Sequence, residues 1–228
     1  MDFAPFEAKI GYSFRNRKFL ETAFTHRSYL NENRAPGREH NERLEFLGDA
    51  VLELAVTEFL FAKYPEKNEG DLTAYRAALV NTISISDAGT KLGMNEFLLL
   101  SKGEARDTGR ARQIILANAF EALIGALYLD QGYVAAKDFI AKQLFAKADN
   151  IVEQKLWQDA KSRFQEVAQE VMGITPNYKL LDQSGPDHDK RFLIGAYIGP
   201  EKVSVGEGKS KQEAEQDAAQ KALVAKGW

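Results

Sequence analysis

The spacing of apolar residues limits most strongly what this chain can fold into, because it changes once, near residue 157. Before that point apolar side chains recur at three and four positions, the period of a helix with one buried face. The pattern is clearest over residues 19–25, 43–64, 72–92, 114–129 and 133–145. Turn-forming residues interrupt it at 33–37, 65–70, 101–109 and 131–132. Residues 1–150 are therefore predicted to form an all-α domain.

The second part of the chain has the pattern of a small α+β domain. A helix is predicted over residues 160–171, followed by strands over 177–182, 190–198 and 202–206. Gly199-Pro200 supplies the turn between the last two strands. A final helix is predicted from Ser210 to about residue 224, because Ser210 and Glu213 have the spacing of a capping box. Residues 157–228 are thus predicted to form an α-β-β-β-α unit, after a linker over about 149–156.

Composition limits the classes of protein to consider. The chain has no cysteine, which excludes disulfides and thiolate metal sites. Its first residues lack the basic region and apolar stretch of a secretory signal, so we expect a cytoplasmic protein. The longest apolar stretch, residues 114–129, is too short and too polar to span a membrane, and no membrane partner is expected. With a net charge of −3, a nucleic-acid partner would have to be bound by a few well-placed cations.

Acidic residues gather near the start of the second long helical segment. Glu42, Glu45 and Asp49 are spaced i, i+3 and i+7, so a helix places them within about 60° of one another around its axis. Three like charges on one stripe repel each other unless a cation lies among them. A solvated acidic face is the simpler alternative, but most neighbours in this segment, such as Leu44 and Val51, are apolar. The acids are therefore candidates for a functional site.

A second acidic feature lies within residues 114–129. Asn118 and Glu121 are spaced i, i+3 on this otherwise apolar stretch, where a carboxylate needs a partner to offset its desolvation. The partner could be a lysine or arginine, or a cation shared with the acidic stripe. Converging carboxylates are ligands for Mg²⁺, which activates water and stabilises charge on a phosphate. Glu69, at a predicted helix start, is a further candidate, although the helix dipole alone also favours an acid there.

The segment 41–52, Asn-Glu-Arg-Leu-Glu-Phe-Leu-Gly-Asp-Ala-Val-Leu, resembles the signature of the ribonuclease III family. Residues 25–29, 69–72, 115–117 and 121–126 agree with the same family, so the resemblance covers essentially the whole chain in order. It implies a bacterial-type endoribonuclease that hydrolyses phosphodiester bonds in double-stranded RNA, in the processing of rRNA and mRNA. It also implies staggered cuts that leave 5′-phosphate and 3′-hydroxyl ends with two-nucleotide 3′ overhangs.

The same resemblance implies roles for individual residues. A Mg²⁺ ion, for which Mn²⁺ would substitute, would be held by Glu45, Asp49, Asn118 and Glu121. Glu42 would support this site, and Glu69 would serve a second metal or position water and RNA. These five acids, Glu42, Glu45, Asp49, Glu69 and Glu121, form the implied catalytic set. Family members are homodimers, which implies that Phe46 packs into the partner subunit; packing in its own core is the alternative.

Position 118 departs from the family pattern, which commonly has aspartate there. The amide of Asn118 can still ligate Mg²⁺ but brings no negative charge, so a raised metal requirement is expected. Three explanations stay open: a tolerated natural variant, an engineered change that traps a complex, or a weakened enzyme. Because the other acids are intact, cutting activity is expected. The alternative functions are a dimeric double-stranded RNA-binding protein that does not cut, and a helical hydrolase of small phosphate esters, against which the second domain argues.

The second domain resembles a double-stranded RNA-binding domain, which recognises A-form shape across two minor grooves. The first helix would face a minor groove with Arg163, Gln165 and Glu166. The loop before the second strand would bring His188 to 2′-hydroxyl groups. The start of the last helix would bind phosphates with Lys209, Ser210 and Lys211. Gln212 and Glu215 stand where cations are frequent in the family, so modest, salt-sensitive affinity is expected; for His188 and the lysines, ordinary solvated side chains are the alternative.

Overall fold

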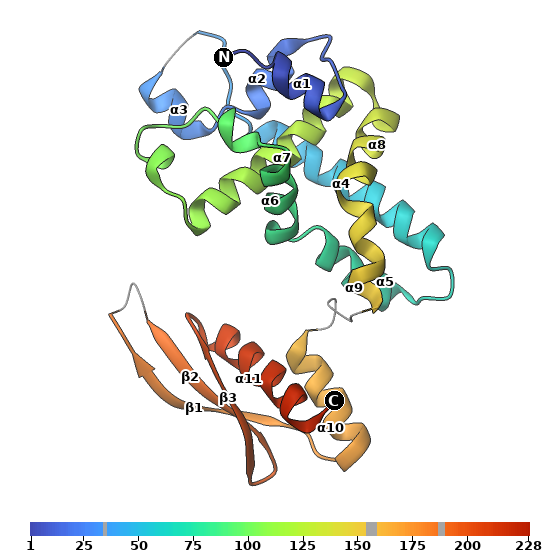
Figure 1. Ribbon diagram of the computed structural model, residues 1–228, viewed down its shortest axis with the longest axis vertical. Coiled ribbons are helices and arrows are strands. Elements are labelled where there is room, and N and C mark those ends of the chain that lie inside the picture. Colours follow the sequence, from blue (N-terminus) through green and yellow to red (C-terminus); the bar gives the residue numbers. More distant parts are fainter. Residues whose placement is uncertain (34–35, 154–158, 187–189) are drawn as a thin grey trace. The chain divides into compact units, whose positions relative to one another are not determined.

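The computed structural model describes residues 1–33, 36–153, 159–186 and 190–228. The chain divides into two compact units, Met1–Trp157 and Gln158–Trp228, which are described separately. The first unit is helical, as predicted (Figure 1). Its first α-helices are α1 (Ala4–Ile10), α2 (Arg17–Ala23), α3 (Arg27–Glu32), α4 (Glu42–Lys63) and α5 (Glu69–Leu79). The others are α6 (Thr82–Lys91), α7 (Arg110–Gln131), α8 (Tyr133–Leu144) and α9 (Ala148–Glu153), with 3₁₀ turns at Met94–Glu96, Glu104–Arg106 and Phe145–Lys147.

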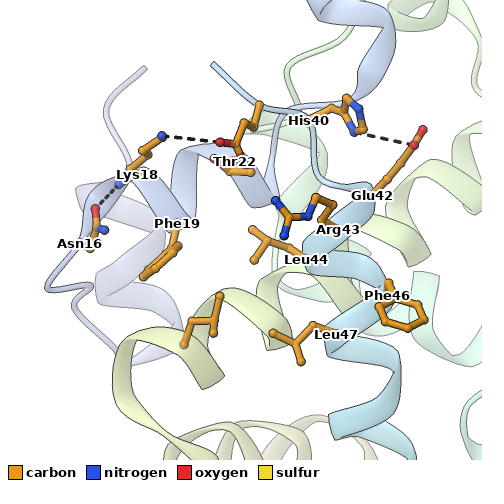
Figure 2. Close-up of a pocket in the computed structure, with 12 residues that line it drawn as sticks. Asn16, Lys18, Phe19, Thr22, His40, Glu42, Arg43, Leu44, Phe46 and Leu47 are labelled. Carbon is orange, nitrogen blue, oxygen red and sulfur yellow. Dashed lines mark hydrogen bonds and ion pairs between the residues drawn. The ribbon is translucent and has the colours of Figure 1, made fainter. Parts of the chain in front are cut away.

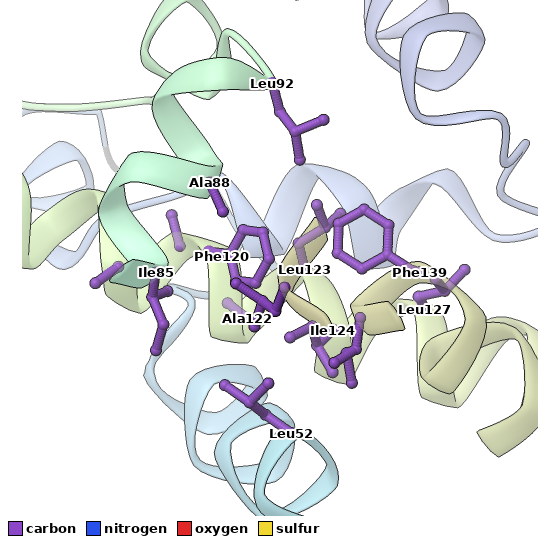
Figure 3. Close-up of a cluster of buried hydrophobic side chains, with 14 of the residues drawn as sticks. Leu52, Ile85, Ala88, Leu92, Phe120, Ala122, Leu123, Ile124, Leu127 and Phe139 are labelled. Atoms are coloured by element: carbon purple, nitrogen blue, oxygen red, sulfur yellow. The ribbon is translucent and has the colours of Figure 1, made fainter. Parts of the chain in front are cut away.

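The two longest of these helices, α4 and α7, form the centre of the first unit. Side chains of α7 are buried around most of its circumference, and Figure 3 shows Phe120 and Leu123 packed among residues such as Leu52 of α4, Ile85 of α6 and Phe139 of α8. A helix that is apolar on all sides is typical of a protein core. The helix is longer than the apolar stretch 114–129, so the expectation that this segment is too short and too polar to span a membrane is wrong by length and composition. Among the described residues α7 is the one such helix, and 61% of its apolar window is buried.

The helical pattern of residues 72–92 is divided between two helices. Because α5 ends at Leu79 and α6 begins at Thr82, one continuous helix there is wrong. Asn81 causes the break: its side-chain oxygen accepts a hydrogen bond from the backbone N–H of Ser84 at 2.9 Å and caps α6. The apolar spacing does not reveal this cap, because α5 before it and α6 after it both have buried apolar residues.

The predicted linker over about residues 149–156 is partly helical. Its first half belongs to α9, in which Ile151 is buried in the core of the first unit. At the end of α4, Lys63 and Tyr64 donate hydrogen bonds to the carboxylate of Asp149 at 2.7 and 3.1 Å. The helical domain therefore extends beyond residue 150. The rest of the predicted linker, residues 154–156, lies outside the described residues.

The second unit has the predicted α-β-β-β-α order. It consists of α10 (Ala160–Met172), β1 (Asn177–Ser184), β2 (Arg191–Ile198), β3 (Glu201–Gly208) and α11 (Lys211–Lys226). The strands form one antiparallel sheet in chain order, and both helices lie on the same face of it (Figure 1). Their shared core contains Phe164, Ala196, Ala218 and Leu223. Small residues bring α11 close to the sheet: a Cβ atom on Gly206 would stand 2.1 Å from the backbone nitrogen of Ala218.

Candidate functional site

Helices α4 and α7 cross at two glycines. A Cβ atom on Gly48 would stand 1.7 Å from the backbone oxygen of Glu121, and one on Gly125 would stand 2.2 Å from a backbone oxygen of α4. Side chains cannot be accommodated at such distances, so only glycine lets the two backbones meet here. Glu45 and Asp49 lie on either side of Gly48 in the sequence. The crossing therefore brings acids predicted from two separate segments to one place.

Asn41 fixes the start of α4. Its backbone N–H donates to the carbonyl of Thr25 at 2.9 Å, and its side-chain amide donates to the carbonyl of Ala23 at 3.2 Å. Its own carbonyl accepts a hydrogen bond from the N–H of Glu45 at 2.9 Å. The side chain is buried, so these polar groups need the partners they have. Asn41 thus ties the helix that carries the acids to the segment that joins α2 and α3.

The electrostatic environment of the crossing is that of several carboxylates without a cation. Burial, together with the charges of Asp49 and Glu45, raises the pKa of Glu121 to about 7. Burial and the charges of Glu42 and Asp49 also raise the pKa of Glu45. Among the described residues, no Lys, Arg or His forms an ion pair with Glu45, Asp49 or Glu121. The sequence left a basic partner for Glu121 open as an alternative, and the described structure provides none.

The donor chemistry at the crossing fits a hard divalent cation. Carboxylate oxygens that repel one another are the ligands that Mg²⁺ prefers. In the conformation described, however, no three His, Cys, Asp or Glu side chains within the described ranges already lie close enough to hold a metal ion. Asn118 lies one turn before Glu121 on α7, is half-buried, and has no side-chain hydrogen bond to another described residue. The acids therefore lie close enough to raise one another's pKa, but in this conformation their side chains do not form a metal site.

Glu42 has neighbours that the sequence did not single out. One carboxylate oxygen of Glu42 lies 3.4 Å from the guanidinium of Arg27, and the other lies 3.8 Å from Nδ1 of His40. Arg27 begins α3 next to His26, whose Nδ1 caps that helix by accepting a hydrogen bond from the N–H of Ser28 at 3.3 Å. Two signals in the sequence bear on these neighbours: His40 is near the signature segment, and Arg27 lies within residues 25–29, which agree with the same family.

Glu69 is not brought into this group. It lies exposed in the first turn of α5, and its carboxylate accepts a hydrogen bond from the hydroxyl of Thr73 at 3.5 Å. The charges that raise the pKa of Glu45 and Glu121 come from Glu42, Asp49 and Glu45 itself, and Glu69 is not among them. A role for Glu69 in cutting stays a prediction.

Phe46 is on the surface of the first unit. It is 81% exposed, so the alternative that it packs in its own core is wrong. It lies beside a pocket of about 810 Å³ whose walls come from α4, α2 and the end of α7 (Figure 2). Leu54 and Phe61 are also exposed and follow Phe46 along α4, within about 80° of it around the axis. Such a stripe of exposed apolar side chains is typical of an interaction surface.

In the second unit, the predicted RNA-binding residues lie on α10 and at the start of α11. Gln165 and Glu166 are exposed and Arg163 is half-buried. Ser210 caps α11 by accepting a hydrogen bond from the N–H of Glu213 at 3.1 Å. In return, the Glu213 carboxylate accepts a hydrogen bond from the N–H of Lys209 at 2.9 Å, one residue earlier than in a standard capping box. Lys209 and Lys211 have exposed side chains, and His188 lies outside the described residues.

Glu215 reduces the basic character of this surface. Its carboxylate forms an ion pair with Lys161 of α10 at 2.6 Å. The carboxylate of Asp159 also accepts a hydrogen bond from the side chain of Gln216. These contacts join the start of α10 to α11, so Glu215, which stands in place of a cation, helps to connect the two helices.

Comparisons with known proteins agree with both units. A model of ribonuclease-III-like proteins matches residues 16–148, and a model of the double-stranded RNA binding motif matches residues 160–224. Ribonuclease 3 of Geobacillus kaustophilus is 47% identical over 221 residues, which are 97% of this chain and 89% of that protein. Ribonuclease 3 of Nitratiruptor is 44% identical over 218 residues, 96% of this chain and 94% of that protein. A solved structure of the nuclease domain of ribonuclease III from Campylobacter jejuni is 39% identical and superposes with a TM-score of 0.56. The match covers 62% of this chain and 98% of that one. That structure was described for flexibility in a region involved in dimer formation.

Proposed function

The chain belongs to the ribonuclease III family, and we propose that it is a magnesium-dependent endoribonuclease that cuts double-stranded RNA. The products would carry 5′-phosphate and 3′-hydroxyl ends with two-nucleotide 3′ overhangs. The cellular role proposed is processing of rRNA and mRNA in the cytoplasm. The observation that supports cutting most directly is the group of carboxylates at the α4–α7 crossing, which lies in a protein that also has an RNA-binding unit.

Residues of both crossing helices would hold the cation. Glu45 and Asp49 from α4, and Asn118 and Glu121 from α7, supply oxygen ligands. A bound Mg²⁺ or Mn²⁺ ion supplies a water of lowered pKa and stabilises negative charge on the phosphate. Because burial and its neighbours raise the pKa of Glu121 to about 7, part of the molecules carry a proton on this carboxyl at neutral pH, and that proton would be released when Glu121 becomes a ligand. Glu42 would support the site, and Glu69 would position water or RNA.

A homodimer is proposed from the apolar surface of α4. In a dimer with two-fold symmetry, each copy presents the same surface to the other. Phe46 of one copy can then enter the pocket beside Phe46 of the second copy, while Leu54 and Phe61 extend the contact along the helix. Two copies would bring two groups of carboxylates to one duplex, as a staggered cut of both strands requires.

The second unit would hold the duplex. A domain of this kind recognises A-form shape and contributes little base readout. The exposed side chains of α10 and the lysines at the start of α11 are the proposed contacts: Arg163, Gln165, Glu166, Lys209, Ser210 and Lys211. His188 is proposed as a further contact. The affinity for the duplex should be modest, because the negative charge of Glu215 offsets the positive charge of Lys161 within this surface.

The experiment that tests this function is cleavage of an end-labelled RNA duplex of about 30 base pairs across a Mg²⁺ titration. We expect the chain with Asn118 to cut and Asn118→Asp to reach the same rate at a lower Mg²⁺ concentration, because the aspartate adds a negative ligand. Glu66→Gln, which removes an exposed acid between α4 and α5, is a control expected to leave the Mg²⁺ requirement unchanged. Single-stranded RNA of the same sequence should not be cut.

Asn118 favours one second candidate, a dimeric protein that binds double-stranded RNA without cutting it. The same titration separates the two. If only Asn118→Asp cuts, the chain with Asn118 is a trapped or silenced nuclease. If neither form cuts and both bind the duplex, the enzyme proposal is wrong and the binding protein stands.

A further inference from the structure

His40 has a buried polar atom that the structure leaves without a hydrogen bond. Its Nδ1 has no partner among the residues that the structure describes, although the residue itself is half-buried. Buried polar atoms nearly always have a partner, so an exception in a native protein needs an explanation. The charged atom recorded nearest to this nitrogen is Oε2 of Glu42, at 3.8 Å, and Figure 2 shows the two side chains directed toward each other.

Each carboxylate oxygen of Glu42 has a basic side chain nearby. Arg27 lies 3.4 Å from Oε1, and His40 lies 3.8 Å from Oε2, so each oxygen lies near a different basic side chain. The backbone on which both residues sit is fixed by the buried Asn41 between them. A small rotation of either side chain would shorten 3.8 Å to a hydrogen bond from Nδ1–H to the carboxylate.

We propose that His40 is a positioning residue for the cutting reaction, which acts by holding the Glu42 carboxylate in one orientation beside Glu45. This inference rests on the proposed function. Glu42 lies one turn before Glu45, and a carboxylate that rotated freely there would present a variable negative charge to the cation site. A Glu42 carboxylate that is held at both oxygens would present a constant negative charge to the cation site. His40 itself touches neither the phosphate nor the metal ligands in this account.

The geometry of imidazole provides a sharp test. The amide nitrogen of asparagine can replace Nδ1, whereas that of glutamine reaches the place of Nε2. In the full-length chain, single-turnover cutting of the RNA duplex is measured for His40→Ala, His40→Asn and His40→Gln. Loss of a residue that orients a ligand typically costs about 10- to 100-fold. We expect His40→Ala and His40→Gln to cut at least about 10-fold more slowly, and His40→Asn to stay within about 3-fold of the natural chain.

A double-variant comparison shows whether His40 acts through Glu42. If it does, His40→Ala with Glu42→Gln should cut no more slowly than Glu42→Gln alone. Duplex affinity measured with Ca²⁺ in place of Mg²⁺, and the oligomeric state, should not change, which separates positioning from folding. Equal rates for all three His40 variants and the natural chain, or losses that multiply in the double variant, would overturn the proposal.

Failure of the proposed function can be distinguished from failure of this inference. If the natural chain does not cut, the same variants are compared by Mn²⁺ binding, followed by electron paramagnetic resonance. Weaker Mn²⁺ binding by His40→Gln than by His40→Asn would still support positioning, and equal binding would contradict it. The comparison of His40→Asn with His40→Gln remains possible if His40→Ala does not fold, because both variants keep a polar side chain at this position.

Discussion

At the scale of single residues, the acids at the crossing cost stability in the folded chain. Glu121 is the clearest example, because burial and two neighbouring carboxylates raise its pKa to about 7 without a recorded cation partner. A side chain chosen only for stability would be apolar here, as its neighbours on α7 are. Active sites commonly hold such unfavourable groups, so the arrangement is better explained by ligand binding than by folding.

Glu121→Gln should therefore stabilise the protein while it abolishes cutting. The folded chain binds this proton more tightly than the unfolded chain, so stability falls as pH rises from about 4.5 toward about 7 and stays reduced above it. We expect the free energy of unfolding at pH 8, without divalent cations, to rise by about 1–2 kcal/mol, after a discount for the partial exposure of the group. Near pH 4.5 the gain should be much smaller. Calorimetry with Glu66→Gln as control checks this, and an equal gain at both pH values would contradict it.

At the scale of elements, the site depends on how closely α4 and α7 approach each other. Neither helix positions the acids alone, since Glu45 and Asp49 belong to one and Glu121 to the other. Gly48 and Gly125 set the separation, because any side chain at either position would overlap the backbone of the opposite helix. Glycine in a helix normally lowers stability, so its use here reflects packing.

Gly48→Ala should force the two helices apart. The added Cβ would stand 1.7 Å from a backbone oxygen that cannot rotate away, so we expect a loss of about 3 kcal/mol in stability. Cutting should fall even in molecules that remain folded, since Glu121 moves relative to Glu45. Gly103→Ala is the matched control, because its Cβ would meet nothing closer than 3.9 Å. Thermal unfolding and duplex cleavage are the measurements, and similar behaviour of the two variants would refute this account of the crossing.

The start of α11 is the second element on which the proposed function depends. Lys211 is exposed in its first turn, where the helix dipole also favours an anion. If it binds a phosphate, Lys211→Gln should weaken duplex binding and lower the slope of log K against log salt concentration by about 1. Anisotropy titrations over a KCl series give this slope. Lys202→Gln, an exposed lysine on β3, should leave it unchanged, and an unchanged slope for Lys211→Gln would remove this residue from the RNA contact.

At the scale of the whole molecule, the apolar surface of α4 is the basis of the proposed homodimer. Phe46, Leu54 and Phe61 are all more than half exposed, which is unfavourable for an isolated chain in water. The helical unit has its own core, so these side chains are not needed to fold it. Their exposure is best explained by a second copy.

Phe46→Glu should reduce self-association, because a charge would then be placed at the centre of the proposed contact. Sedimentation measurements should show a shift from dimer toward monomer, with a dissociation constant raised by at least about 100-fold. Val134→Glu is a matched control, since Val134 has the same 81% exposure but lies on α8. If both variants remain dimeric, the interface lies elsewhere; if both dissociate, the loss is not specific to α4.

The sequence by itself determined the class of each unit and the identity of the acids. Apolar periods predicted the helical domain and the α-β-β-β-α order, because burial on one face of an element leaves its period in the chain. Two features of the helical unit were not predicted from the apolar period. The break at Asn81 depends on one side-chain hydrogen bond, and the helix α9 depends on contacts with α4. Sequence spacing also placed Glu42, Glu45 and Asp49 on one stripe of a helix, since that requires only local geometry.

Only the tertiary structure decided which of these acids meet. Glu121 joins Glu45 and Asp49 because two glycines 77 positions apart let their helices touch, and nothing in local spacing encodes that approach. The same packing leaves Glu69 outside the group and brings His40 and Arg27 to Glu42. It also turns Phe46 outward, where the sequence allowed either surface or core. Contacts between distant segments depend on how whole elements pack, and so they appear only once the chain has folded.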